Sequence, residues 1–161
     1  MLMNNRILII DDQRHAGPDG KIESASESFR VLLKAAGSDP FIEDGYVDGV
    51  QIRDAQVLAQ RVFARIKSED FGWLIVDLLW PSGQIDFGER LLVHLLDDFD
   101  CLLPRDQIFV HSIVIDPPLK KRLSLRFRIP EENIHPKDRK GREKILGFFR
   151  KELLTGEDEI W

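Results

Sequence analysis

Three aspartates are the residues of this chain whose types and positions could do chemistry. Asp11 and Asp12 directly follow a short apolar run, RILII, and Asp77 lies inside a second run, WLIVDLLWP. A charged carboxylate inside an apolar run is costly unless it has a partner or loses its charge. We therefore expect Asp77 either to have an ionic partner or to take part in a reaction.

A divalent cation is the partner that three neighbouring carboxylates favour. If the apolar runs are parallel strands, their carboxyl ends meet at one edge of a sheet, where ligands bind in such folds. Hard oxygen ligands favour Mg²⁺, and a carboxylate beside Mg²⁺ can attack phosphorus, because the metal neutralises the phosphoryl oxygens. Ser112 lies in the fourth apolar run and Lys137 follows the fifth, so they could hold the remaining oxygens. The set predicts an aspartyl-phosphate site, with Mg²⁺ on Asp11, Asp12 and Asp77.

The elements that must position these residues alternate along the chain. Apolar runs predict strands at residues 6–10, 73–79, 108–115 and 133–135, with a short, interrupted second strand at residues 41–47. Helical spacing of apolar residues predicts helices at residues 24–37, 54–72, 87–99 and 142–154. A Gly/Pro-containing loop is expected at residues 13–21, and the basic run at residues 120–128 is interpreted as a solvated face. We interpret the alternation as a three-layer, doubly wound α/β domain with a five-stranded parallel sheet and about five helices.

Two helix starts and two helix ends carry their own signals. Ser24 with Glu27 three residues later has the pattern of a capping box, and Asp54 can cap the second helix. Gly37 and Gly72 are predicted to end these two helices.

Composition and length set the domain organisation. The chain has 161 residues, of which 43% are hydrophobic and 32% charged, as is typical of one globular domain. We expect a single domain at residues 1–155, followed by an acidic tail at residues 156–161. The formal charge is −5, yet residues 120–144 carry ten Lys or Arg against four Asp or Glu. A basic region on an acidic body indicates a polar protein partner and not nucleic acid.

Cysteine usage and the absence of targeting segments indicate the compartment. A single cysteine, Cys101, excludes an internal disulfide and favours a reducing environment. The first residues lack the pattern of a signal peptide, and no apolar stretch is long enough to span a bilayer. A cytoplasmic protein with no membrane partner is therefore expected.

Two motifs carry a resemblance to a known family. In RILIIDDQ a first strand ends in paired acids, and in VDLLWP an aspartate is followed four residues later by Pro81; DFGERLL then enters a helix. With Ser112 and Lys137 in the hydroxyl and lysine positions, residues 6 to 150 resemble the receiver domain of two-component response regulators. The resemblance implies a flavodoxin-like fold, Asp77 as the phosphoacceptor, and Mg²⁺ as the cofactor.

The resemblance also implies a place in phosphorelay signal transduction. Such a phosphoprotein takes its phosphoryl group from a histidine kinase or a phosphotransfer protein and then regulates a downstream protein, which the sequence does not identify. The length leaves no room for a DNA-binding output module, so a stand-alone receiver is expected. Members of the family often form homodimers through the fourth and fifth strands and the last helix.

Because the chain departs from the family pattern, two alternatives to a phosphorylated receiver are considered. Pro136 precedes Lys137, whereas the family has the reverse order, and this leaves the orientation of the lysine side chain open. The loop between Pro81 and Gly88 is three residues longer, and the fifth strand has no aromatic switch residue. These features favour a pseudo-receiver, an interaction module that works without phosphorylation. A Mg²⁺-dependent phosphohydrolase would need an acid two residues after the nucleophile, where Leu79 stands, so no enzymatic turnover is expected.

Overall fold

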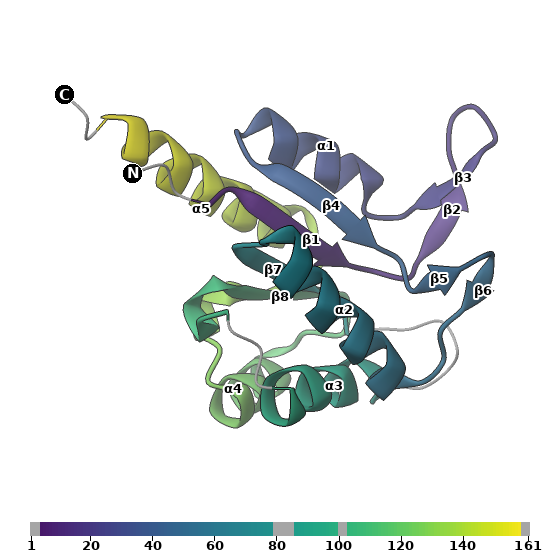
Figure 1. Cartoon of the computed structure of the whole chain (residues 1–161). Coiled ribbons are helices and arrows are strands. Elements are labelled where there is room, and N and C mark those ends of the chain that lie inside the picture. Colours follow the sequence, from purple (N-terminus) through teal and green to yellow (C-terminus); the bar gives the residue numbers. More distant parts are fainter. Residues whose placement is uncertain (1–3, 79–85, 100–102, 159–161) are drawn as a thin grey trace.

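Five parallel strands form the centre of the molecule. Figure 1 shows the chain as a computed structural model, which describes residues 4–78, 86–99 and 103–158. The strands lie in the order β4 (Asp39–Glu43), β1 (Arg6–Ile10), β7 (Trp73–Val76), β8 (Ile108–Ser112) and β9 (Ile134–Pro136), and every neighbouring pair is parallel. The order in the sheet reverses direction between β1 and β7, which is the point where ligands bind in doubly wound sheets. The predicted α/β fold of the flavodoxin-like type is confirmed.

Helices cover both faces of this sheet (Figure 1). One face carries α1 (Glu27–Ala35) and α5 (Arg139–Asp158), while the other carries α2 (Ala55–Glu69), α3 (Phe87–Leu92) and α4 (Pro117–Phe127). A π-helix, Val93–Asp98, continues α3, and single 3-10 turns at Arg105–Gln107 and Glu131–Asn133 lead into β8 and β9.

Alternation along the buried strands divides the core into two layers. In β1, Leu8 and Ile10 pack toward α2 and α3, whereas Ile7 and Ile9 pack toward α1 and α5. This period of two is the side-chain geometry of a strand buried on both faces. An aromatic cluster of Trp73, Phe109, Phe148 and Phe149, with ring centroids 5.1 to 6.3 Å apart, then fixes α5 on the sheet.

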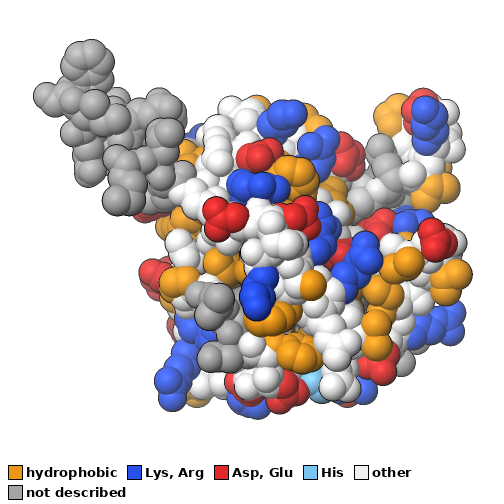
Figure 2. Space-filling view, viewed as in Figure 1, with side chains coloured by type: hydrophobic (Ala, Val, Ile, Leu, Met, Phe, Trp, Pro, Cys, Tyr) orange, Lys and Arg blue, Asp and Glu red, His pale blue; other side chains and the backbone are white. Residues whose placement is uncertain are grey.

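Two short hairpins replace segments that were predicted as a loop and as part of a strand. Residues 13–21 are not simply a loop, because β2 (Arg14–Ala16) pairs antiparallel with β3 (Ile22–Ser24). The second strand of the sheet ends at Glu43, since β5 (Tyr46–Val47) pairs instead with β6 (Val50–Gln51). Figure 2 shows hydrophobic side chains over this second hairpin, where Val47 and Val50 are exposed.

Helix boundaries also differ from the predictions. The prediction of a capping box at Ser24 and Glu27 is wrong. Helix α1 begins after Ser26, and the Ser24 hydroxyl accepts a hydrogen bond from the backbone N–H of Ser26 instead. Asp54 caps α2 as predicted, accepting from the backbone N–H of Gln56. However, α2 ends at Glu69 and is capped by Asp70, whose φ of 55° is left-handed, two residues before the glycine that was expected to end the helix.

The basic run after β8 is a helix. Asp116 accepts a hydrogen bond from the backbone N–H of Leu119 and caps α4, and two prolines occupy the first turn, where their missing N–H groups cost nothing. The final helix, α5, begins at Arg139 and continues to Asp158, four residues past the predicted end. No helix in the described residues combines the length and the apolar character needed to cross a membrane. Leu79, Trp80, Pro81 and Cys101 lie outside the described residues.

Candidate functional site

The three aspartates of the sequence analysis lie at the predicted edge of the sheet. Asp11 and Asp12 directly follow β1, and Asp77 directly follows β7, its neighbour in the sheet. The backbone N–H of Asp77 donates to the carbonyl of Ile10 at 2.9 Å, so the ladder continues up to these residues. All three side chains are buried, with at most 3% of each residue exposed. The switch point of the fold thus collects three carboxylates away from bulk water.

Lys137 points into this cluster. Its Nζ donates to Oδ2 of Asp11 at 2.9 Å and to Oδ2 of Asp77 at 3.1 Å. The reversed order of Pro136 and Lys137 left this orientation open in the sequence. The structure accounts for it, because the backbone N–H of Lys137 donates to the carbonyl of Ser112 and extends the pairing of β9 with β8.

Ser112 is the last residue of β8 and lies one strand away from Asp77 in the sheet. It is fully buried, and its Oγ has no hydrogen-bond partner among the described residues. Leaving a buried hydroxyl unpaired costs about 1–3 kcal/mol. The predicted hydroxyl group is therefore at the correct strand end, and it has unused hydrogen-bonding capacity.

Two hydrogen-bond donors at the site were not predicted. The hydroxyl of Ser26, just before α1, donates to Oδ2 of Asp11 at 2.6 Å. The side-chain amide of Gln51, on β6, donates to Oδ2 of Asp12 at 2.6 Å. Neither residue belongs to a motif, and Gln51 is 39 residues from its partner in the sequence, so no local signal identifies it.

The hairpin that carries Gln51 is attached to the other hairpin. Arg14 of β2 forms an ion pair with Asp44 at 2.5 Å, and its guanidinium lies 3.4 Å from the ring centroid of Tyr46 in β5. The two hairpins lie side by side at the carboxyl end of the sheet (Figure 1). This contact between β2 and β5 fixes the hairpin from which Gln51 reaches Asp12.

A fourth acid at the same edge is already neutralised. Glu43 ends β4 and is 2% exposed. Its Oε1 lies 2.5 Å from Nε of Arg61 and 3.6 Å from a terminal nitrogen of Arg65, both on α2. Glu43 therefore has its own cationic partners and is separate from the group around Lys137. Sequence reasoning had not identified it.

The cluster holds more negative than positive charge. Burial, together with the negative charges of Asp11 and Asp77, raises the pKa of Asp12 to about 8. Burial lowers the pKa of Lys137, but the same two carboxylates outweigh this effect, so its pKa is raised and the ammonium is retained. Three ionised carboxylates facing one ammonium leave two negative charges in excess, so the group becomes neutral when two carboxyls are protonated or when one divalent cation binds.

The donor set fits Mg²⁺ in chemistry and in charge. Asp12 Oδ1 is buried with no hydrogen-bond partner among the described residues, so one carboxylate oxygen is available to a hard cation. However, the described residues contain no group of three or more His, Cys, Asp or Glu side chains already arranged around a metal position. The ammonium of Lys137 forms ion pairs with both Asp11 and Asp77 and supplies one positive charge to the cluster.

Comparisons with protein family models, with curated proteins and with solved structures found no match.

Proposed function

We propose that this chain is a receiver-type signalling protein that accepts a phosphoryl group on Asp77. The observation that carries the proposal is the convergence of Lys137 on Asp11 and Asp77, with 2.9 and 3.1 Å between the bonded atoms, at the switch point of a flavodoxin-like sheet. An aspartate, a lysine and paired acids in this arrangement are what the resemblance to receiver domains leads us to expect.

Each residue of the cluster has a role in the proposed transfer. An oxygen of Asp77 attacks phosphorus, so an O–P bond forms while the N–P bond to a donor histidine breaks and its electron pair stays on the imidazole nitrogen. Mg²⁺, held by Asp11, Asp12 and Asp77, would neutralise the phosphoryl oxygens. Lys137 then donates to one phosphoryl oxygen, and the unpaired hydroxyl of Ser112 donates to another.

The proposal includes partners on both sides of the reaction. A histidine kinase or a phosphotransfer protein supplies the phosphoryl group, and the phosphorylated chain regulates a downstream protein. The acyl phosphate is retained as a signal, so the chain works as a switch and not as an enzyme with turnover.

Acetyl phosphate treatment with intact-mass analysis tests the proposal. We expect one added phosphoryl group when Mg²⁺ is present, none when it is removed with EDTA, and none for Asp77→Asn. Asp39→Asn is the matched control, because Asp39 is exposed at the start of β4, at the opposite end of that strand from the site. Phosphorylation of Asp77→Asn at the wild-type level would refute Asp77 as the acceptor.

A second candidate function is an interaction module that works without phosphorylation. The observation that favours it is the ion pairing of Lys137, which already neutralises part of the carboxylate charge without a metal. This candidate predicts neither Mg²⁺ binding nor a gain of mass in the same experiment. A wild-type chain that binds Mg²⁺ and is phosphorylated would exclude it.

A further inference from the structure

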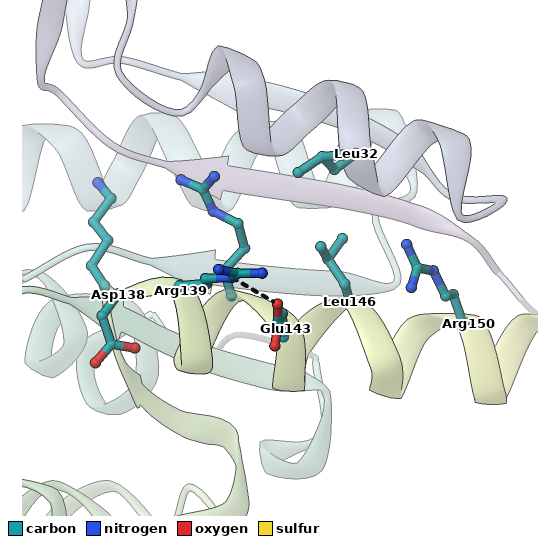
Figure 3. Close-up of a pocket in the computed structure, with 8 residues that line it drawn as sticks. Leu32, Asp138, Arg139, Glu143, Leu146 and Arg150 are labelled. Carbon is teal, nitrogen blue, oxygen red and sulfur yellow. Dashed lines mark hydrogen bonds and ion pairs between the residues drawn. The ribbon is translucent and has the colours of Figure 1, made fainter.

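A cleft between α1 and α5 contains unpaired positive charge. Its volume is about 860 Å³, and it is lined by Leu32 of α1 and by residues of α5 and of the segment before it. Figure 3 shows Leu146 and Arg150 rising from α5 toward α1, with Leu32 facing them from the other side. Lys137, which holds Asp11 and Asp77, lies in the wall at one end, so the cleft adjoins the acidic cluster.

The charges of the cleft are only partly balanced. Arg139 pairs with Glu143 at 3.2 Å, and Lys137 pairs with the acidic cluster. Arg142 and Arg150 have no ion pair or hydrogen bond from their guanidinium groups to any other described residue; Arg142 lies 6.0 Å from the ring centroid of Phe29. The cleft therefore offers two guanidinium groups with unused hydrogen-bond donors.

The spacing of these groups gives the cleft a defined pattern. Arg142, Leu146 and Arg150 are four residues apart, so they lie on one face of α5 and extend over about 12 Å at 1.5 Å per residue. Leu146 is buried and Leu32 is 37% exposed. The pattern is thus an apolar contact surface with a cation at each end.

We propose that this cleft binds a nucleotide, with phosphate groups on Arg142 and the base against Leu32 and Leu146. Guanidinium groups match the geometry of phosphate oxygens, and the volume lies within the range of about 300–1,000 Å³ found for small-molecule sites. Two acids also line the cleft, and both have partners: Glu143 pairs with Arg139, and Asp138 accepts a hydrogen bond from the backbone N–H of Gly141. This inference is independent of phosphorylation at Asp77.

Isothermal titration calorimetry with ATP as the probe tests the inference. EDTA is present throughout, so that no metal can bridge the phosphates to the acidic cluster. We expect saturable binding to the wild type, weakened about tenfold to a hundredfold by Arg142→Gln, as loss of a charge-assisted hydrogen bond predicts. Arg150→Gln should also weaken binding. Arg53→Gln is the matched control, because Arg53 is exposed before α2 and away from the cleft, and it should bind ATP as the wild type does.

A second measurement does not depend on any variant. NMR amide shifts of the wild type are recorded with ATP, with pyrophosphate and with adenosine. We expect ATP to shift residues of α1 and α5 at lower concentration than either fragment does. No binding of ATP at millimolar concentration, or shifts confined to other elements, would overturn the inference. Equal affinity of the wild type and Arg142→Gln for ATP would also overturn the inference.

Discussion

Gln51 donates a 2.6 Å hydrogen bond to Oδ2 of Asp12, and the other oxygen of that carboxylate, Oδ1, has no hydrogen-bond partner among the described residues. The amide thus fixes the rotation of the carboxylate and leaves one oxygen for a cation. Partners that orient a metal ligand in this way contribute substantially to metal affinity. The hairpin β5–β6 thereby becomes part of the proposed site, although it lies outside the five-stranded sheet.

Removing the amide of Gln51 should weaken Mg²⁺ binding. We expect Gln51→Ala to lower the affinity by about tenfold to a hundredfold, because Asp12 loses the group that orients it. Titration calorimetry with MgCl₂ measures the change. Gln60→Ala, at an exposed position of α2, is the control and should bind Mg²⁺ as the wild type does. Unchanged affinity in Gln51→Ala would show that Asp12 needs no orienting partner.

The sequence predicted the sheet and the acidic cluster because both depend on local patterns. Buried strands are continuous apolar runs, and parallel strands bring Asp11 and Asp77 to one edge in any fold of this class. The hairpins were missed because their strands have only two or three residues and no apolar alternation. Gln51 could not be predicted either, because its contact with Asp12 depends on how the hairpin packs against the sheet.

The direction of the Lys137 side chain could not be predicted from the sequence either. Its presence after the fifth strand was read from the sequence, whereas its direction was not, because proline stands before it instead of after it. The direction follows from a backbone hydrogen bond to Ser112, which is a tertiary contact across two strands.

Neutralising Lys137 should destabilise the fold when no metal is present. Lys137→Gln leaves the buried carboxylates of Asp11 and Asp77 without their ammonium partner, and we expect a loss of about 3–5 kcal/mol in the free energy of unfolding. Urea unfolding in EDTA measures this loss, with the exposed Lys140→Gln as control. Added Mg²⁺ should restore part of the stability, because a cation replaces the lost charge. If Lys137→Gln were as stable as the wild type in EDTA, this would contradict a stabilising role of the ion pairs that Lys137 forms with Asp11 and Asp77.

His111 should make stability depend on pH below neutrality. Burial, followed by the charges of Lys137 and Arg142, lowers the pKa of His111 from 6.5 to about 3. The unfolded chain therefore takes up a proton near pH 6.5 while the folded chain does not, and stability falls as pH decreases from 6.5 toward 3. The expected slope is about 1.4 kcal/mol per pH unit from this residue.

Comparison of the wild type with His111→Gln isolates this contribution, because glutamine does not titrate. The free energy of unfolding is measured in urea between pH 7 and pH 5, and the slope should be smaller in the variant. NMR titration of the imidazole gives an independent reading. A midpoint for His111 near pH 6 would show that the folded chain accepts the proton without the expected cost.

Two glycines of α5 should respond oppositely to alanine. A Cβ on Gly141 would lie 2.0 Å from the carbonyl oxygen of Pro136, whereas a Cβ on Gly147 would meet nothing within 4 Å. Gly147→Ala should therefore stabilise the helix by about 0.5–1 kcal/mol, since alanine loses less conformational entropy. Gly141→Ala should destabilise the chain by about 1–3 kcal/mol, because the helix must move away from β9.

In Gly141→Ala, the movement of α5 away from β9 should also change the candidate site, because Lys137 lies between Pro136 and the start of α5. Thermal unfolding of both variants measures the stability change, and titration with Mg²⁺ measures the effect on the acidic cluster. We expect Mg²⁺ affinity to change in Gly141→Ala and to stay at the wild-type value in Gly147→Ala. Equal stability of the two variants would show that α5 does not approach β9 as closely as the structure has it.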